Sequence, residues 1–340
     1  MEKEKIKDIK IGLNKMQAEL RNKARISECF HFDTESCKGK IKSAHSIQRN
    51  GRLSLLEEEV QGNMKIYSFT EVQPNENTGK LELKPIGKAS ASTFFGFCDY
   101  HDNKLFSVIE DNPFIDCSEH CFLHSYRAFA ITHHRKTEQI KAFESDSKFN
   151  DIMGSTTSSS LAGTRIGYQD GEKIRIQMNE ILKNETYDEM ESLTIQFPDF
   201  YPIASSSSFT PKYTPKTNKK LNYDTNPDVP YEYLFLNVLP DLNGSKVIFS
   251  CLPGSEKSIQ YIDEFDSLPD LKQNQILTSI LIGYIENTFI SPYIYNKLTE
   301  KEKECLIREL SDTTIFSTKF QTKHFLSKLN FFQNRFIKSA

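Results

Sequence analysis

The stretch Thr93–Phe106, TFFGFCDYHDNKLF, decides how the N-terminal part of the chain folds. Cys98 and His101 stand three residues apart at the start of a helix that we predict over residues 101–111, and Asp102 follows directly. The spacing C-x-x-H is typical of half a metal site at a helix entry. The phenylalanines around it are the expected core of a small module, because a module of this size has little else to bury.

A second half-site lies upstream, where Cys29 and Cys37 flank a turn-rich loop. Structural zinc takes four nitrogen or sulfur ligands in a tetrahedron, and half-sites from two separate segments supply them. We therefore predict a structural zinc site made of Cys29, Cys37, Cys98 and His101. The alternative is that these cysteines are free thiols buried as small hydrophobic groups, since seven residues separate the first two where about two to four are usual.

The residues between and beside the half-sites carry reactive groups. His45 lies on a strand predicted over residues 40–48, eight residues after Cys37. A neutral imidazole can take a proton from water near pH 7, and a carboxylate such as Asp102 can hold a divalent cation that stabilises charge on a phosphate. If zinc holds the strand and the helix together, His45 and Asp102 face each other, and the pair is suited to phosphodiester hydrolysis.

This order of features resembles the treble-clef HNH, or His-Me finger, endonucleases over residues 29–110. The family motif runs through two zinc ligands, a strand with a histidine base, a hairpin, two more zinc ligands and a metal-binding residue. The resemblance implies a zinc-stabilised ββα module in which His45 is the general base and Asp102 holds a catalytic Mg²⁺ or Mn²⁺ ion. The wider string IGKASASTFFGFCDYHDNKLFSVIE is also similar to a group of uncharacterised bacterial proteins.

Two positions differ from the family pattern. Ala44 stands where many zinc-bearing members have an aspartate before the histidine, and Thr93 stands near the position of an asparagine that orients the hairpin loop. The catalytic ion therefore lacks one family ligand. We assign this role to Glu110, with Asn103 and Asp99 as alternatives.

Two residues are candidates for contact with substrate. Thr93 is one, because of its place in the motif. Arg127, on a helix predicted over residues 118–143, is the other, since a guanidinium can clamp a phosphate; the alternative is a structural ion pair. His133 and His134 on the same helix are predicted to be exposed, either as a phosphate-contacting patch or as a solvated basic face.

Composition limits the classes of function. The net charge is −3 and the isoelectric point about 6.3, which argues against a protein coated by nucleic acid but allows local basic patches. Such patches occur over residues 38–52 and 133–141. We find no apolar run long enough to cross a membrane and no segment typical of a secretory signal. Seven unevenly spaced cysteines agree with a reducing compartment, so we predict a cytoplasmic protein without a membrane partner.

These features predict a metal-dependent nuclease that hydrolyses DNA or RNA, with DNA as the preferred substrate. A nuclease that can damage its own cell needs control, and the resemblance suggests a setting in bacterial defence against phage. The alternative is a non-catalytic zinc-binding protein that binds nucleic acid or a partner protein.

The chain as a whole is predicted to be α+β in two regions. Residues 1–150 hold the HNH-like module with flanking helices, one of them an amphipathic helix over residues 1–25. Residues 151–340 form a domain of antiparallel strands and helices for regulation, for dimerisation or for binding a partner. The expected elements of that domain are a linker or flexible loop at 153–163, strands at 191–198, 233–240 and 246–253, a polar loop at 205–230, and helices at 257–265, 270–287, 299–311 and 319–337.

Overall fold

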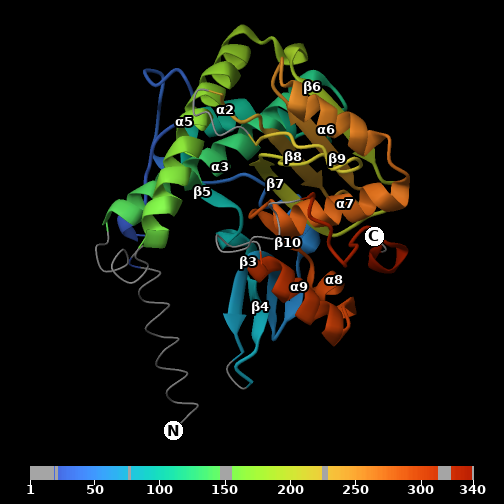
Figure 1. Ribbon diagram of the computed structural model, residues 1–340. Helices are drawn as coiled ribbons and strands as arrows, with labels where there is room; N and C mark the ends of the chain where they lie inside the picture. Colours follow the sequence, from blue (N-terminus) through green and yellow to red (C-terminus); the bar gives the residue numbers. More distant parts are fainter. Residues whose placement is uncertain are drawn as a thin grey trace.

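The computed structural model places α-helices around antiparallel β-sheets, so the fold is mixed α+β as predicted (Figure 1). The amphipathic helix predicted over residues 1–25 lies largely outside the described residues. The structure describes Glu19 and residues 22–75, 78–145, 155–223, 229–312 and 323–338.

The larger sheet has eight strands in the order β2-β3-β10-β7-β8-β9-β6, and β4 pairs with β3 beside this path. Three of its strands come from before residue 150 and the others from after it, so the two predicted regions share one sheet. In Figure 1, β3 and β4 extend below the rest of the sheet. The strands are β2 (Glu58–Val60), β3 (Asn63–Pro74), β4 (Leu81–Ile86), β6 (Glu191–Gln196), β7 (Ile203–Phe209), β8 (Leu234–Leu239), β9 (Lys246–Cys251) and β10 (Thr288–Ile290).

Strand β7 lies inside this sheet, between β10 and β8, and all of its residues are buried. The polar loop predicted at 205–230 is therefore wrong over residues 205–209. Four consecutive serines do not show the apolar alternation of a strand, and a polar side chain inside a core is uncommon. Pairing on both edges satisfies the backbone of β7, which is what permits such a sequence in the interior.

Helices cover both faces of the sheet. Along β8, Leu236 and Val238 pack in one core cluster with Tyr261 and Phe265 of α6, whereas Phe235 packs in another with Phe129 of α3. Since alternate residues of a strand point to opposite faces, α3 and α6 lie on opposite sides of the sheet. The helices are α2 (Asp99–Glu110), α3 (Ser118–Ser145), α5 (Ser155–Asn184), α6 (Glu256–Asp266), α7 (Asp270–Gly283), α8 (Pro292–Lys297) and α9 (Glu300–Asp312), with short 3₁₀ turns at Ser54–Leu56, Lys88–Ser90, Tyr187–Glu189 and Asn334–Phe336.

Two predictions about the second region are wrong. Residues 155–163 of the segment expected to be a linker or flexible loop at 153–163 belong to α5, which begins at Ser155 and packs against α3. Residues 323–337 form no α-helix, although Phe331 and Phe336 are buried in the main core. Closely spaced aromatic residues that anchor a loop give the same apolar pattern as one face of a helix.

A second, two-stranded sheet pairs β1 (Ile41–His45) with β5 (Thr93–Cys98), and α2 follows β5 without a break. Its core contains Phe94, Phe97 and Phe106, as predicted, whereas Phe95, which was also expected there, is half-buried and lies outside this cluster. The rings of Phe97 and Phe106 meet edge to face with centroids 5.1 Å apart. This hairpin and helix, residues 41–45 and 93–110, are called the hairpin–helix unit below. Strands β2, β3 and β4 lie between β1 and β5 in the chain and connect the unit to the larger sheet.

Candidate metal centre and neighbouring polar cluster

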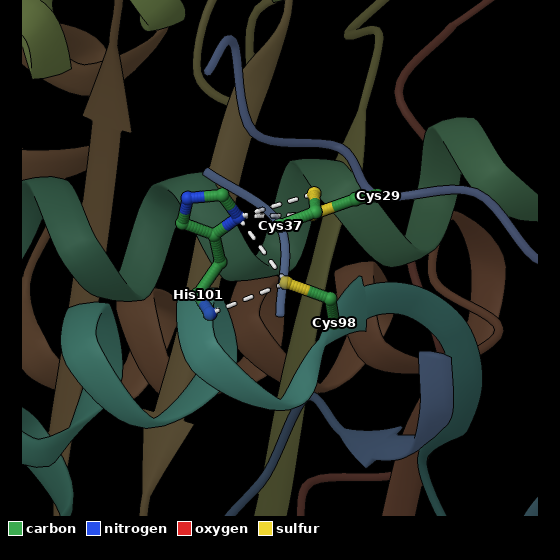
Figure 2. A group of neighbouring side chains, drawn as sticks. All are labelled: Cys29, Cys37, Cys98 and His101. Atoms are coloured by element: carbon green, nitrogen blue, oxygen red, sulfur yellow. Dashed lines mark hydrogen bonds between the residues drawn. The ribbon is translucent and has the colours of Figure 1, made fainter. Parts of the chain in front are cut away.

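Cys29, Cys37, Cys98 and His101 come together as predicted, with one ligand atom of each within 4.8 Å of all the others. Figure 2 shows the His101 ring directed at the three sulfurs. Its Nδ1 lies 3.4 Å from Cys29 Sγ, 3.6 Å from Cys37 Sγ and 3.3 Å from Cys98 Sγ. A tetrahedral zinc ion with Zn–S of about 2.3 Å and Zn–N of about 2.0 Å separates such atoms by roughly 3.6 Å. The four residues therefore fit zinc.

The start of α2 sets one half of this centre. Cys98 is the N-cap residue of the helix, and its Sγ accepts a hydrogen bond of 3.5 Å from the backbone N–H of His101. A sulfur at this position satisfies a helix amide that has no carbonyl partner inside the helix. The C-x-x-H spacing therefore brings both ligands to the same end of the helix.

The other half is attached to the unit by backbone hydrogen bonds. The N–H groups of Glu28 and Phe30 donate to the carbonyls of Phe95 and Gly96, over 3.2 and 2.8 Å, and this holds Cys29 beside β5. Residues 28–30 therefore lie along β5 and hydrogen-bond to it, although they do not form a regular β-strand.

The loop after Cys37 folds back on the start of α2. The N–H of Tyr100 donates to the carbonyl of Lys38. Gly39 has φ +77°, a conformation that residues with a side chain rarely adopt, and a Cβ there would lie 2.8 Å from Asp99 Cβ. The glycine therefore allows the close approach that brings Cys37 to His101.

The outer nitrogen of His101 also has a partner. Its Nε2 lies 3.0 Å from Ser36 Oγ, so the N–H can be donated to the hydroxyl and Nδ1 is left to face the sulfurs. His31 stacks on the His101 ring at a centroid distance of 3.8 Å, and its own Nδ1 accepts a hydrogen bond from the Asp33 amide. His31 therefore supports the ligand from outside the four-residue group.

The thiols differ in acidity. Burial raises the pKa of Cys37 to about 12 and also raises the pKa of Cys29. At Cys98 burial acts in the same direction, but backbone hydrogen bonds from His101 and Lys38 outweigh it and lower the pKa. A thiolate is the form that binds metal, so occupancy of this centre requires proton release and is favoured by rising pH.

His45 ends strand β1, near enough to Arg127 and Glu110 for their charges to act on it; these side chains and Asp102 form the polar cluster described next. Its Nδ1 lies 2.9 Å from the carbonyl oxygen of Ala91. Because a carbonyl only accepts, Nδ1 carries the proton and the lone pair is on Nε2. Burial lowers the pKa of His45, and the charges of Arg49 and Arg127 lower it further, whereas the hydrogen bond to Ala91 and the charge of Glu110 act to raise it. The imidazole is therefore neutral at pH 7.

Arg127 joins the two candidate carboxylates. One guanidinium nitrogen lies 2.5 Å from Glu110 Oε1, and another lies 3.5 Å from Asp102 Oδ1. The longer contact lacks hydrogen-bond geometry, and Asp102 Oδ1 is buried without a hydrogen-bond partner. Burial raises the pKa of Asp102, whereas the charge of Arg127 acts to lower it. The cluster thus holds two carboxylates around one buried guanidinium.

The ends of the hairpin and of α2 are tied to each other. Gln48 donates from Nε2 to the backbone carbonyl of Glu110 over 2.7 Å. Thr93 lies opposite His45 in the β1–β5 register, and its hydroxyl donates to the carbonyl of Ser90. The structure therefore brings His45 and Thr93 together on the hairpin, while the roles of Thr93 and Arg127 toward substrate stay predictions.

Sequence reasoning missed three groups of this cluster. The carbonyl of Ala91 and the amide of Gln48 leave no pattern in the sequence. Arg49 lies within the basic run at 38–52, which is the signal that could have identified it.

The prediction that His133 and His134 are exposed is wrong. Both are buried, and His133 Nε2 lies 2.5 Å from Glu172 of α5 while its ring stacks on Tyr168. Neither histidine belongs to a metal-ligand group, and within the described ranges the three cysteines with His101 form the one group of that kind.

Comparisons with models of protein families, with curated proteins and with solved structures find no match to this chain. Within the part of the chain that the structure describes, no helix is long and apolar enough to cross a membrane.

Replacing Arg127 with methionine tests the ion pairs of this cluster. Its side chain is 4% exposed, and its removal leaves Asp102 and Glu110 without the guanidinium between them. We expect a loss of about 2 kcal/mol in the free energy of unfolding, less than for a fully buried pair because each carboxylate is about a third exposed. Denaturant titration measures it.

Arg165→Met is the matched control, because Arg165 pairs with Glu144 on the surface, where the two side chains are 56% and 49% exposed. We expect that change to stay within about 0.5 kcal/mol. Equal effects of the two substitutions would show that the Arg127 pairs contribute nothing beyond a surface contact.

Proposed function

We propose that this chain is a metal-dependent endonuclease of the HNH type, which hydrolyses phosphodiester bonds of nucleic acid, with DNA as the main substrate. The observation that carries the proposal is the state of His45, whose Nδ1 is held by the Ala91 carbonyl while Nε2 keeps its lone pair. This base lies at the end of β1, next to a helix that bears two carboxylates. Zinc ligands, histidine strand, hairpin and helix follow in the order expected for a treble-clef ββα module.

In this proposal His45 takes the proton from the attacking water. General base catalysis requires the neutral form, which burial of the imidazole favours. Asp102 and Glu110 are the residues that would hold Mg²⁺ or Mn²⁺. The buried Asp102 Oδ1, which has no hydrogen-bond partner, supports this fit because such an atom is costly unless something satisfies it. A divalent ion supplies stabilisation of the charge that develops on the phosphate and the leaving oxygen.

The Cys3His centre has a structural role in the same proposal. All four tetrahedral positions are filled by side chains of the protein, whereas a catalytic zinc keeps one position open for water or substrate. The centre joins the Cys29 segment, the Cys37 loop and the start of α2, and so holds the helix that carries Asp102 against the hairpin that carries His45.

The surface around β1 is suited to a polyanion. Lys38, Lys40, Lys42 and Arg49 are exposed along and beside the strand. Lysines and arginines in such a row neutralise phosphates and release counterions, which gives affinity without sequence specificity. This local charge supports nucleic acid as the substrate class despite the net charge of −3.

The remaining assignments rest on the resemblance to the nuclease family. They are a setting in defence against phage, and control of the nuclease by residues 151–340 through dimerisation or a partner protein. The proposed cytoplasmic location rests instead on the unevenly spaced cysteines.

A second candidate is a zinc-binding protein without catalysis, which binds nucleic acid or a partner. The contact of Arg127 with both Asp102 and Glu110 favours it, because one cation already compensates the two carboxylates.

Incubation of the purified protein with plasmid DNA, single-stranded DNA and RNA tests the proposal, with Mg²⁺ or Mn²⁺ and with excess chelator. We expect cleavage that requires the divalent ion and falls at least about 10²-fold in Asp102→Asn, since losing several kcal/mol of charge stabilisation has this size.

Asp111→Asn is the control at the other end of the same helix, because Asp111 is an exposed carboxylate to which the proposal gives no role. Its cleavage rate should match that of the wild type. No cleavage of any substrate with either ion would exclude the nuclease and leave the binding protein. Equal cleavage by Asp102→Asn would exclude the proposed role of Asp102 as an ion ligand.

A further inference from the structure

Asn287 connects the larger sheet to the hairpin–helix unit. It lies directly before β10 and is 1% exposed. Its Nδ2 donates to Ser46 Oγ over 2.9 Å, to Ser92 Oγ over 3.2 Å and to the carbonyl of Ser206 over 2.7 Å. One amide group therefore holds three segments that are far apart in the chain.

Ser46 and Ser92 directly adjoin the two strands of the unit, beside the groups that orient the candidate base. Ser46 follows His45 directly, and Ser92 follows Ala91, whose carbonyl holds His45 Nδ1. The backbone N–H of Ser46 donates to the carbonyl of Ser92 over 2.9 Å, and the two hydroxyls are 2.5 Å apart. A shift of Ser92 therefore moves the carbonyl that determines which nitrogen of His45 carries the proton.

The backbone at Ser92 needs support from its surroundings. Its φ is +58°, which is uncommon for a residue with a side chain. Such a conformation costs of the order of 1–3 kcal/mol and persists where neighbouring contacts hold it. Its hydroxyl accepts hydrogen bonds from the Ile47 amide over 3.1 Å and from Asn287, and these two bonds help to hold Ser92 in this conformation.

Asn287 is itself held on its other sides. Its Oδ1 lies 3.5 Å from a guanidinium nitrogen of the partly exposed Arg135, so the amide nitrogen is the end that faces the serines. Its carbonyl accepts from Ser205 Oγ over 3.2 Å, and the neighbouring Ser206 amide donates to it as well. The amide is therefore a rigid part of β7 and β10 rather than of the hairpin.

We propose that Asn287 is a positioning residue for His45: it holds the Ser46 and Ser92 hydroxyls and thereby keeps the Ala91 carbonyl on Nδ1 of the base. The role in catalysis rests on the proposed nuclease function, whereas the effect on the imidazole does not. The larger sheet thus determines the tautomer and direction of His45, although Ser46, the next residue after this base, lies 241 residues before Asn287 in the chain. A change at β10 is transmitted to the base through this amide.

Nitrogen-15 NMR of histidine side chains tests the proposal. Signals of His45 are identified by their loss in His45→Gln. In the wild type we expect one neutral tautomer, with a protonated Nδ1 and an unprotonated Nε2. In Asn287→Ala the two nitrogen shifts should move toward each other, because the carbonyl no longer selects one tautomer.

Asn237→Ala is the matched control. Asn237 is buried on β8, pairs in register with Ser206, and its side chain has no hydrogen-bond partner. This variant should keep the wild-type tautomer. A wild-type tautomer in folded Asn287→Ala would overturn the proposal, as would an equal change in both variants.

A second variant covers the case in which Asn287→Ala does not fold. Ser92→Gly suits the positive φ and removes the side chain whose hydroxyl accepts from Asn287 and from the Ile47 amide. It should also mix the tautomers, and an unchanged tautomer in this variant counts against the proposal.

Cleavage assays add a readout that a structural role alone would not move. If the wild type cleaves DNA, Asn287→Ala should lower kcat by about 10²-fold with KM little changed, because misplacement of a catalytic group by about 1 Å has an effect of this size. Failure of the nuclease function appears as no cleavage by the wild type, and the NMR result then still decides the positioning of His45.

Discussion

Cys98→Ser is expected to lose the zinc and to unfold the hairpin–helix unit. The Cys98 side chain is 1% exposed, its Sγ accepts a hydrogen bond from the backbone N–H of His101, and it lies 3.3 Å from His101 Nδ1. Structural zinc contributes about 10–16 kcal/mol in small zinc peptides at neutral pH, more than the whole stability of many domains.

Zinc content and thermal unfolding measure this effect. We expect about one zinc per chain in the wild type, and a large fall in the unfolding temperature both on chelation and in Cys98→Ser. The effect of chelator should increase as the pH falls, because protons compete with the metal for the thiolates.

Cys121→Ser is the matched control. Cys121 is 3% exposed and packs with Leu239 and Ile248, away from the four ligands. It should destabilise the chain modestly through its changed packing and keep the full zinc content. A wild-type content below about half a zinc per chain, unchanged in Cys98→Ser, would remove the structural premise of the proposed function.

The Cys3His group, which could hold a metal ion, was predictable because its signals are local. Cys98 and His101 are brought together by one turn of helix, and the four-ligand requirement of zinc then points to Cys29 and Cys37. The long spacing between those two cysteines is accommodated by the Cys37 loop, which bends at Gly39 toward the start of α2. The same local rules correctly placed β8 and β9, since two short apolar runs flank a turn.

The failures have a common physical cause, which is that contacts distant in the chain decide the structure. The serine strand β7 is extended because β8 and β10 pair with it on both sides, and nothing in its own side chains indicates this. The link from Asn287 to Ser46 spans 241 residues, and an asparagine before a short strand has no distinguishing pattern. Arg127 could be named as a candidate for phosphate or for an ion pair, but its carboxylate partners follow from packing alone.

His45→Ala is expected to lower the rate of DNA cleavage by about 10²–10⁴-fold, the usual contribution of a general base. The base must be neutral to act, so activity is lost as the pH falls through the pKa of His45 and reaches a plateau above it. Burial of the imidazole lowers that pKa, so the acidic limb of the profile should lie below pH 6.5, the ordinary value for histidine.

The charged groups that act on His45 give this prediction a second test. Arg49 and Arg127 lower its pKa, and Glu110 raises it. Arg49 is exposed, so Arg49→Met removes one positive charge without opening the buried cluster. The acidic limb of kcat should then move to higher pH, while Lys65→Met on β3 should leave it in place. Initial rates of plasmid nicking across pH measure both effects. Full activity in His45→Ala, or an acidic limb that stays in place in Arg49→Met, would show that another group takes the proton.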